Sequence, residues 1–128
     1  MRPSIHHVQM AIPKGGEDRT RWFFGTLLGL EEIEKPANLR ARGGVWFETG
    51  NLQLHLGVDP SFTPATKAHI AFEFADLNGL RGRLTDAGMT IIEDEPLPGY
   101  ERFYVSDPFG NRIECLCPSE SSAHGVST

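Results

Sequence analysis

One set of landmarks occurs twice along this chain, in the same order and about 60 residues apart each time. Each set comprises a histidine that opens an alternating apolar and polar run, a glycine that ends a helix-like segment, and a Gly–Asn pair before a last alternating run. The sets are His7, Gly29 and residues 50–51 in one half, and His69, Gly88 and residues 110–111 in the other. Three ordered coincidences rarely arise by chance, so the sequence predicts a duplicated structural unit.

Each copy follows the order strand, helix, strand, strand, strand. Alternation with a period of two indicates the strands, and apolar residues at helical spacing indicate the helices. The predicted elements are a strand over 5–12, a helix over 18–28 and strands over 30–34, 45–48 and 52–58, then a strand over 69–74, a helix capped by Asp76 and ended by Gly88, and strands over 89–93, 103–106 and 112–117. Residues 36–42 are predicted to be a loop.

This order predicts an α+β fold of two tandem β-α-β-β-β modules, over residues 4–58 and 68–118. A helix covers one face of each sheet, and the two sheets together form a curved mixed sheet around a cavity. With 128 residues the chain suits a single domain, here 4–118. The Ser-rich residues 119–128 are expected to be a disordered tail.

Composition excludes several classes of function. The net charge is −5 and the arginines are scattered, which argues against nucleic-acid binding, because phosphate contacts need clustered Lys and Arg. No apolar run approaches the roughly 20 residues of a membrane span, and no signal peptide is evident. The two cysteines, Cys115 and Cys117, lie too close on one strand for a relaxed disulfide, which favours a reduced, cytoplasmic setting.

Four side chains on four predicted strands are candidate metal ligands: His7, His55, His69 and Glu114. Imidazole and carboxylate suit divalent Zn, Ni, Mn, Fe or Co. The face that carries them is expected to line the cavity, where several titratable groups are costly to bury unless a metal ties them together. The alternative stays open, since a lone strand histidine is more often exposed or hydrogen-bonded, and the spacings match no short metal motif.

Five further residues are candidate substrate contacts. Gln9 and Gln53 flank the proposed ligands and can hydrogen-bond a bound oxygen. Trp46 can form a wall of the substrate pocket, although a core or interface role fits it too. Arg102 and Tyr104 alternate on one strand, and Arg102 can bind a carboxylate or phosphonate. A surface ion pair of Arg102 with Glu101 or Glu93 is the equal alternative.

The chain resembles the vicinal oxygen chelate superfamily over residues 5–116. This superfamily includes glyoxalase I, fosfomycin-modifying thiol transferases, extradiol dioxygenases, methylmalonyl-CoA epimerase and bleomycin-resistance proteins. The resembling segments are HHVQMAI, FFGTLLGL, VWFETGNLQLHLG, HIAFEF and RFYVSDPFGNRIECL. The last is the most specific, because residues 107–114 match the family pattern Asp-Pro-x-Gly-Asn-x-Ile-Glu.

The resemblance implies one metal ligand from the first and last strand of each module. His7 matches the opening position, since His6 has the wrong parity, and His69 and Glu114 match the second module. His55 is the candidate for the fourth position, but it lies five residues after Gly50, whereas Glu114 lies four after Gly110. A bulge or a different turn must absorb that residue; otherwise Leu54 faces the cavity and three protein ligands remain.

The resemblance also implies a function. We expect a homodimeric, divalent-metal-dependent lyase or isomerase that acts as a Lewis acid on a small substrate with two neighbouring oxygens, with Glu114 assisting proton transfer. The alternatives are a fosfomycin-type thiol transferase and a metal-free drug-sequestering protein. The sequestering role would use the aromatic residues Trp46, Phe47, Phe72 and Phe103, but the presence of all metal-type residues argues against it.

Overall fold

The computed structural model describes residues 1–119. The chain divides into two compact units, residues 1–64 and residues 65–128, which are called the first half and the second half below. The prediction of a disordered tail falls, beyond Ser119, outside the described residues. No helix within residues 1–119 has the length and apolar character needed to cross a membrane.

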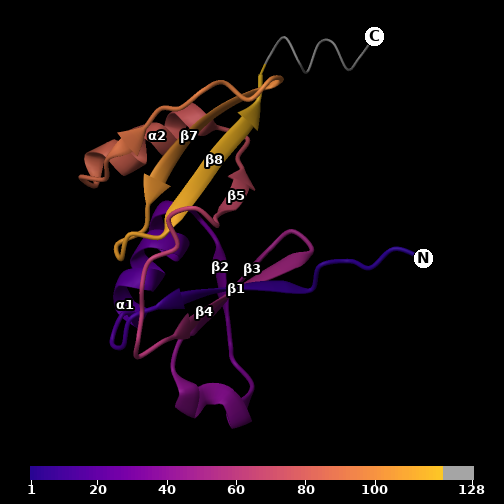
Figure 1. Cartoon of the computed structure of the whole chain (residues 1–128), viewed down its shortest axis with the longest axis vertical. Coiled ribbons are helices and arrows are strands. Elements are labelled where there is room, and N and C mark those ends of the chain that lie inside the picture. The colour runs from indigo at the N-terminus through magenta and orange to yellow at the C-terminus, as the bar shows by residue number, and fades with distance from the viewer. Residues whose placement is uncertain (120–128) are drawn as a thin grey trace. The chain divides into compact units, whose positions relative to one another are not determined.

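The first half is a four-stranded mixed sheet whose strands lie in the order β1, β4, β3, β2 (Figure 1). The first and last strands of the half in sequence, β1 and β4, pair in parallel, whereas the other neighbours are antiparallel. The bounds are β1 His7–Ile12, β2 Glu31–Ile33, β3 Val45–Thr49 and β4 Leu52–Val58. The predicted strands of this half are therefore present, with ends shifted by one or two residues.

One continuous helical segment covers one face of this sheet. It begins as α1, Glu17–Thr20, and continues as a π-helical stretch, η1, Arg21–Leu27. The wider turn shows in the backbone, where the amide of Leu28 donates to the carbonyl of Phe23 at 3.0 Å, five residues back. Phe23 and Phe24 are fully buried, and Phe24 lies 6.0 Å from Phe47 of β3 between ring centroids. Sequence periodicity predicted the helix but not its π geometry.

The second half repeats the arrangement with strand order β5, β8, β7, β6, and β5 pairs with β8 in parallel. Its helix α2 is capped by Asp76, whose carboxylate accepts from the amide of Gly79 at 2.9 Å. Figure 1 shows α2 against the β7–β8 hairpin. The bounds are β5 Ile70–Glu73, α2 Leu77–Asp86, β6 Ile91–Ile92, β7 Tyr100–Ser106 and β8 Arg112–Pro118.

The core of the second half lies between α2 and one face of its sheet. Leu80 and Leu84 of the helix are fully buried, as are Phe103 and Ile113 of the strands. Cys115 lies on this same face, and burial raises the pKa of its thiol to about 12. The thiol therefore stays protonated and packs as a small apolar group. The expected duplicated α+β fold of two strand–helix–strand modules is confirmed.

The two halves differ by one residue in the hairpin before the last strand. Four residues separate the paired Glu48 and Gln53 in the first half, whereas five separate Ser106 and Arg112 in the second. This difference in the connection compensates for the unequal spacing after the Gly–Asn pair, which is five residues from Gly50 to His55 and four from Gly110 to Glu114. As a result His55 pairs with Gln9 of β1, just as Glu114 pairs with Ala71 of β5. His55 and Glu114 are thus structurally equivalent.

The hairpin also decides which way β4 faces. Leu54 and Leu56 are fully buried on the helix-covered side. His55 therefore projects from the other side, together with His7. The alternative in which Leu54 lines that side is not the arrangement found.

Several predicted boundaries differ from the structure. β7 begins at Tyr100, three residues before the predicted strand over 103–106, and β6 spans only Ile91–Ile92 of the predicted 89–93. Residues 36–42, predicted as a loop, include a 3₁₀ helix, η2, over Ala37–Arg42. His69 precedes β5 instead of lying within it. A 3₁₀ helix as short as η2 carries little periodic signal in the sequence, because it spans barely two turns.

Candidate functional site

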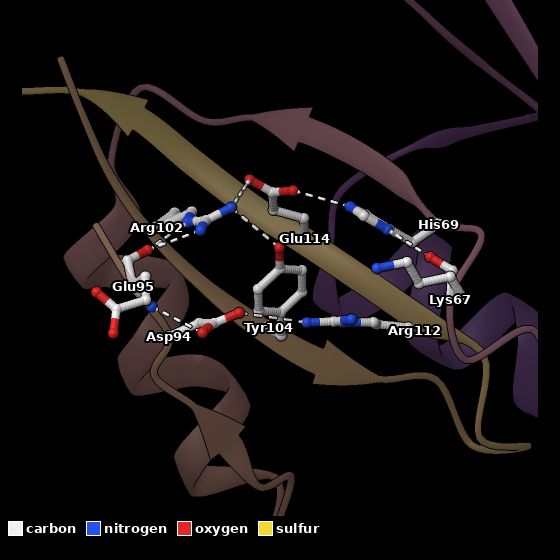
Figure 2. A network of polar contacts seen from close by, with 8 residues as sticks. All are labelled: Lys67, His69, Asp94, Glu95, Arg102, Tyr104, Arg112 and Glu114. Atoms are coloured by element: carbon white, nitrogen blue, oxygen red, sulfur yellow. Dashed lines mark hydrogen bonds and ion pairs between the residues drawn. The ribbon is translucent and has the colours of Figure 1, made fainter. Parts of the chain in front are cut away.

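Glu114 is the centre of a polar network on the face of the second sheet that α2 does not cover (Figure 2). Its carboxylate is only 7% exposed. Oε1 lies 2.9 Å from Nε2 of His69, and Oε2 lies 3.3 Å from Nη1 of Arg102. The parallel register of β5 and β8 brings His69 and Glu114 together, although they are far apart in sequence. A buried carboxylate with two cationic or ligand-type neighbours is a candidate reactive group.

The orientation of His69 suits metal binding. Its Nδ1 lies 3.0 Å from the carbonyl oxygen of Lys67, an acceptor, so Nδ1 carries a proton and donates it. In a neutral ring Nε2 then presents its lone pair to Glu114, and two acceptors face each other at 2.9 Å. That contact is favourable only with a positive charge between them, either a proton or a metal ion.

The spacing of these two atoms also fits shared coordination. Ligand atoms about 2.1 Å from one metal and at a right angle to each other lie about 3 Å apart. A carbonyl that holds the distal nitrogen of a histidine, as Lys67 does for His69, is a common outer-shell partner of metal-binding imidazoles. The donor set of the second half therefore fits a divalent metal.

Arg102 and Tyr104 stand beside Glu114, as their alternation on β7 predicted (Figure 2). Arg102 donates to the hydroxyl of Tyr104 at 3.0 Å and to the carbonyl of Glu95 at 2.7 Å. Its ion pair is with Glu114, so the alternative pairing with Glu101 or Glu93 is not the one found. Glu93 pairs instead with Arg81. The carbonyl of Glu95 thus fixes the guanidinium that holds Glu114.

Sequence reasoning missed Arg112 in this network. Its guanidinium carbon lies 3.8 Å from the centroid of the Tyr104 ring, a cation–π contact. It also lies 3.5 Å from Asp94, in an ion pair with an exposed partner. Arg112 is the first residue of β8, at the same parity as Glu114, and this parity was the available signal.

In the first half, His55 lies between two aromatic rings. Its ring stacks on Trp46 with centroids 3.7 Å apart and planes 3° apart, and on His7 at 4.3 Å and 17°. Its Nε2 donates to the amide oxygen of Gln53 at 2.9 Å. Burial, and then the positive charges of His7, His6 and Lys35, lower the pKa of His55. His55 is therefore a buried, neutral imidazole.

The stacking of His7 on His55 limits which of the two imidazoles can bind a metal ion. An imidazole binds a metal through a lone pair in the plane of its ring. The planes of His7 and His55 are nearly parallel, so one ion cannot lie in both planes at bonding distance. His7 is exposed and has only His6 near its Nδ1, at 3.0 Å. The geometry of the first half therefore favours His7 over His55 as a ligand.

A pocket of about 340 Å³ opens beside this stack. Of the predicted site residues, His7, Gln9, Trp46 and His55 line it. Gln53 does not line the pocket itself, but it hydrogen-bonds His55, which does. Sequence reasoning missed Lys35 and Arg42, which also line the pocket. Arg42 was treated as part of an undifferentiated loop over 36–42, and Lys35 lies between that loop and the predicted strand over 30–34.

Within residues 1–119, no three His, Cys, Asp or Glu side chains form a group that could hold a metal. The four candidate ligands are instead found as two pairs. His7 and His55 are neighbours in the first half, and His69 and Glu114 are neighbours in the second.

Comparison with known proteins identifies the family. The family model described as glyoxalase/bleomycin resistance protein/dioxygenase superfamily matches residues 4–115. The chain belongs to this superfamily. A glyoxalase family protein from Bacillus anthracis is 44% identical over 93% of this chain and 98% of its own, with a TM-score of 0.87. No relative was found among curated proteins.

More distant structures share the superfamily fold. A glyoxalase/dioxygenase from Nostoc punctiforme is 24% identical over 91% of this chain and 92% of its own, with a TM-score of 0.76. The fosfomycin resistance protein FosX from Listeria monocytogenes, in a mutant form complexed with Mn(II) and 1S,2S-dihydroxypropylphosphonic acid, is 17% identical. That match covers 96% of this chain and 98% of the other, with a TM-score of 0.77. At these identities the likeness shows the fold alone.

Proposed function

We propose that this superfamily member is a divalent-metal-dependent enzyme of the lyase or isomerase type, acting on a small substrate with two neighbouring oxygens. The observation that carries the proposal is the contact of His69 Nε2 with Glu114 Oε1, whose 2.9 Å spacing suits two ligands of one metal ion as well as a shared proton. The family, which includes a Mn(II)-bound FosX structure, supports the same chemistry. The metal identity stays open among Zn, Ni, Mn, Fe and Co.

The proposed protein ligands are His7, His69 and Glu114, with His55 as the least favoured fourth. Two imidazoles and one carboxylate leave coordination positions for substrate oxygens. A bound divalent metal would supply Lewis-acid polarisation of those oxygens.

The chain's own residues would then divide the work at the substrate. Glu114 is the residue that can accept or return a substrate proton, since it is the carboxylate of the set. Arg102 donates to Oε2 of Glu114 and so keeps that oxygen oriented. The hydroxyl of Tyr104 accepts from the same Nη1 of Arg102 and can hydrogen-bond a substrate. Gln9, Trp46 and Gln53 would contact or border the substrate in the first half.

The sequestering alternative loses part of its basis in the structure. Of the four aromatic residues that suggested a drug pocket, only Trp46 lines the pocket of the first half. Phe47 and Phe103 are fully buried and Phe72 is 7% exposed, all as parts of the two cores. A fosfomycin-type thiol transferase shares the proposed metal chemistry and remains the second candidate substrate class.

Metal content tests the proposal. We expect purified chain reconstituted with Ni, Zn, Mn or Fe(II) to bind one metal per site, and His69→Ala and Glu114→Ala to abolish binding, as measured by elemental analysis after desalting. Glu101→Ala is the matched control, because Glu101 is an exposed carboxylate on β7. Absence of metal from the reconstituted wild type, or equal loss in the control, would refute the proposal.

Activity assays then separate the substrate classes. We expect turnover of methylglyoxal hemithioacetal if the reaction is glyoxalase-like, and thiol-dependent loss of fosfomycin if it is a transferase. Inactivity on both would remove these two substrates and leave the metal site to be judged by the binding data. Analytical ultracentrifugation checks the proposed homodimer, which a monomer at micromolar concentration would contradict. A cytoplasmic location belongs to the same proposal.

A further inference from the structure

The pocket of the first half has a one-sided charge. Two fixed cations line it, Lys35 and Arg42, and no carboxylate of residues 1–119 lines it. The chain as a whole carries a net charge of −5, so this concentration of positive charge is local.

The segment that carries both cations is held in place by specific contacts. Lys35 lies two residues before η2 and Arg42 is its last residue, and the ammonium of Lys35 donates to the carbonyl of Gly43. Gly44 has φ of +88°, and a Cβ there would lie 2.3 Å from the carbonyl oxygen of Leu56. Only glycine permits this approach to β4. The backbone thus fixes where the two cations emerge.

The two cations are neutralised to different degrees. Glu17 accepts from the amide of Gly44 at 3.0 Å, and this bond is the main cause of its lowered pKa, to which the charge of Lys35 adds. Lys35 therefore has a carboxylate nearby. Arg42 is exposed and forms no ion pair within residues 1–119. Arg42 is the cation available to a ligand.

Other residues of the lining offer a neutral donor and an apolar surface. Gly57 lies beneath Gln9, since a Cβ at Gly57 would come within 2.8 Å of the amide nitrogen of Gln9. The absence of that Cβ lets the Gln9 amide lie against the pocket wall. Trp46 and Leu39 supply apolar surface. A ligand with a small apolar body and one anionic end matches this set.

We propose that this pocket binds an anionic oxygen group of the substrate, a carboxylate or a phosphonate, with Arg42 as the principal contact and Lys35 and Gln9 as supporting ones. The guanidinium matches either group through paired N–H donors. The inference rests on the proposed function in one respect, that a substrate enters the pocket beside His7. It narrows the substrate to anions.

Nuclear magnetic resonance of the full-length, metal-free chain tests this directly. The probes are propylphosphonate, butyrate and the neutral isostere butyramide, each titrated at constant ionic strength. We expect both anions, but not butyramide, to shift the indole N–H signal of Trp46 with saturation. Trp22 is the internal control, because it lies on η1 and is not part of the pocket lining. The anion with the lower dissociation constant identifies the group that the pocket prefers.

Two variants make the test specific. We expect Arg42→Gln to weaken anion binding about tenfold or more, the loss typical of a charge-assisted contact. Lys14→Gln removes an exposed cation of the same half outside the pocket and should leave the dissociation constant unchanged. Equal binding by wild type and Arg42→Gln, an equal response to butyramide, or no shift of Trp46 would each overturn the inference.

The outcome is separable from that of the proposed function. Anion binding without metal binding would retain this inference and refute the metal-dependent enzyme. Metal binding by a chain whose Trp46 signal does not respond to anions would retain the metal-dependent enzyme and overturn this inference. Because the titration uses metal-free protein, loss of the metal site alone cannot produce a negative result.

Discussion

The two halves of the chain share a backbone plan and differ in the chemistry placed on it. In both, the last strand pairs in parallel with the first, and register makes His55 equivalent to Glu114. Trp46 and Tyr104 then occupy equivalent places, as the cross-strand partners of those two residues. The first half fills these positions with stacked neutral rings, whereas the second fills them with a charged network.

This difference shows that position and chemical role separate after duplication. The scaffold fixes where a side chain projects, but its neighbours decide what it can do. Glu114 is held between His69 and Arg102, and its contact with His69 is completed by a proton or a metal ion. His55, at the same place, is held by Trp46 and Gln53 and is already satisfied. The two halves are therefore expected to contribute unequally to metal binding.

The largest effect should come from Glu114→Gln. The amide keeps the shape of the side chain but removes the negative charge, so we expect metal affinity to fall by more than about 100-fold, beyond the range of outer-shell substitutions. Calorimetric titration with the reconstituting metal measures this. Retention of wild-type affinity would mean that the network of the second half is a structural ion-pair cluster.

A smaller loss is expected from Arg102→Gln. Arg102 orients Glu114 without being a proposed ligand, and the loss of such a partner typically lowers metal affinity about 10–100-fold. Arg81→Gln is the matched control, because Arg81 pairs with the exposed Glu93 in the same half. The same affinity in both variants would show that Arg102 does not position Glu114. Thermal unfolding of the metal-free proteins separates loss of stability from loss of the ligand.

His55→Phe distinguishes three ligands from four. Phenylalanine preserves a flat ring between Trp46 and His7 and removes both nitrogens. If His55 only supports the stack, metal affinity should change by less than about tenfold. A loss comparable to that of Glu114→Gln would instead make the halves functionally symmetric, with His55 as the fourth ligand. Near-ultraviolet circular dichroism reports whether Trp46 keeps its packing.

The smallest predicted effect is on stability, and it concerns the contact of Glu17 with Gly44 beside η2. The corresponding connection of the second half contains no helix like η2. The bond of Glu17 with the Gly44 amide lowers the pKa of Glu17 from 4.5, so the carboxylate stabilises the fold above that pH. This stabilisation is lost as pH falls through the lowered pKa. Glu17→Gln should therefore cost about 1 kcal/mol at pH 7.

Denaturant unfolding at several pH values checks this prediction. The stability difference between wild type and Glu17→Gln should shrink as the solution is acidified below pH 4.5. Asp18→Asn is the control, because the Asp18 side chain is 98% exposed and its pair with Arg21 is a surface contact. A difference independent of pH would show that the carboxylate charge is not what holds the segment.

The choice of His7, His69 and Glu114 as ligands came from the family resemblance and stays a prediction, whereas the sequence by itself determined the duplication and the order of the strands and helices. These follow from period-two and helical alternation and from repeated landmarks, which are local properties of a chain. It also placed Arg102 and Tyr104 on the face of Glu114 by parity alone. The π-helical geometry of residues 21–27 and the 3₁₀ helix of residues 37–42 lacked such a signal.

Tertiary structure decided what local pattern left open. Whether His55 or Leu54 faces the pocket depended on the length of a hairpin connection, because one residue reverses the face of a strand. Whether Arg102 pairs with Glu101, Glu93 or Glu114 depended on cross-strand register. The cationic pocket depended on glycines that bring η2 against β4. In each case the deciding contact joins residues that are distant in sequence, and alternation along one strand carries no information about such pairs.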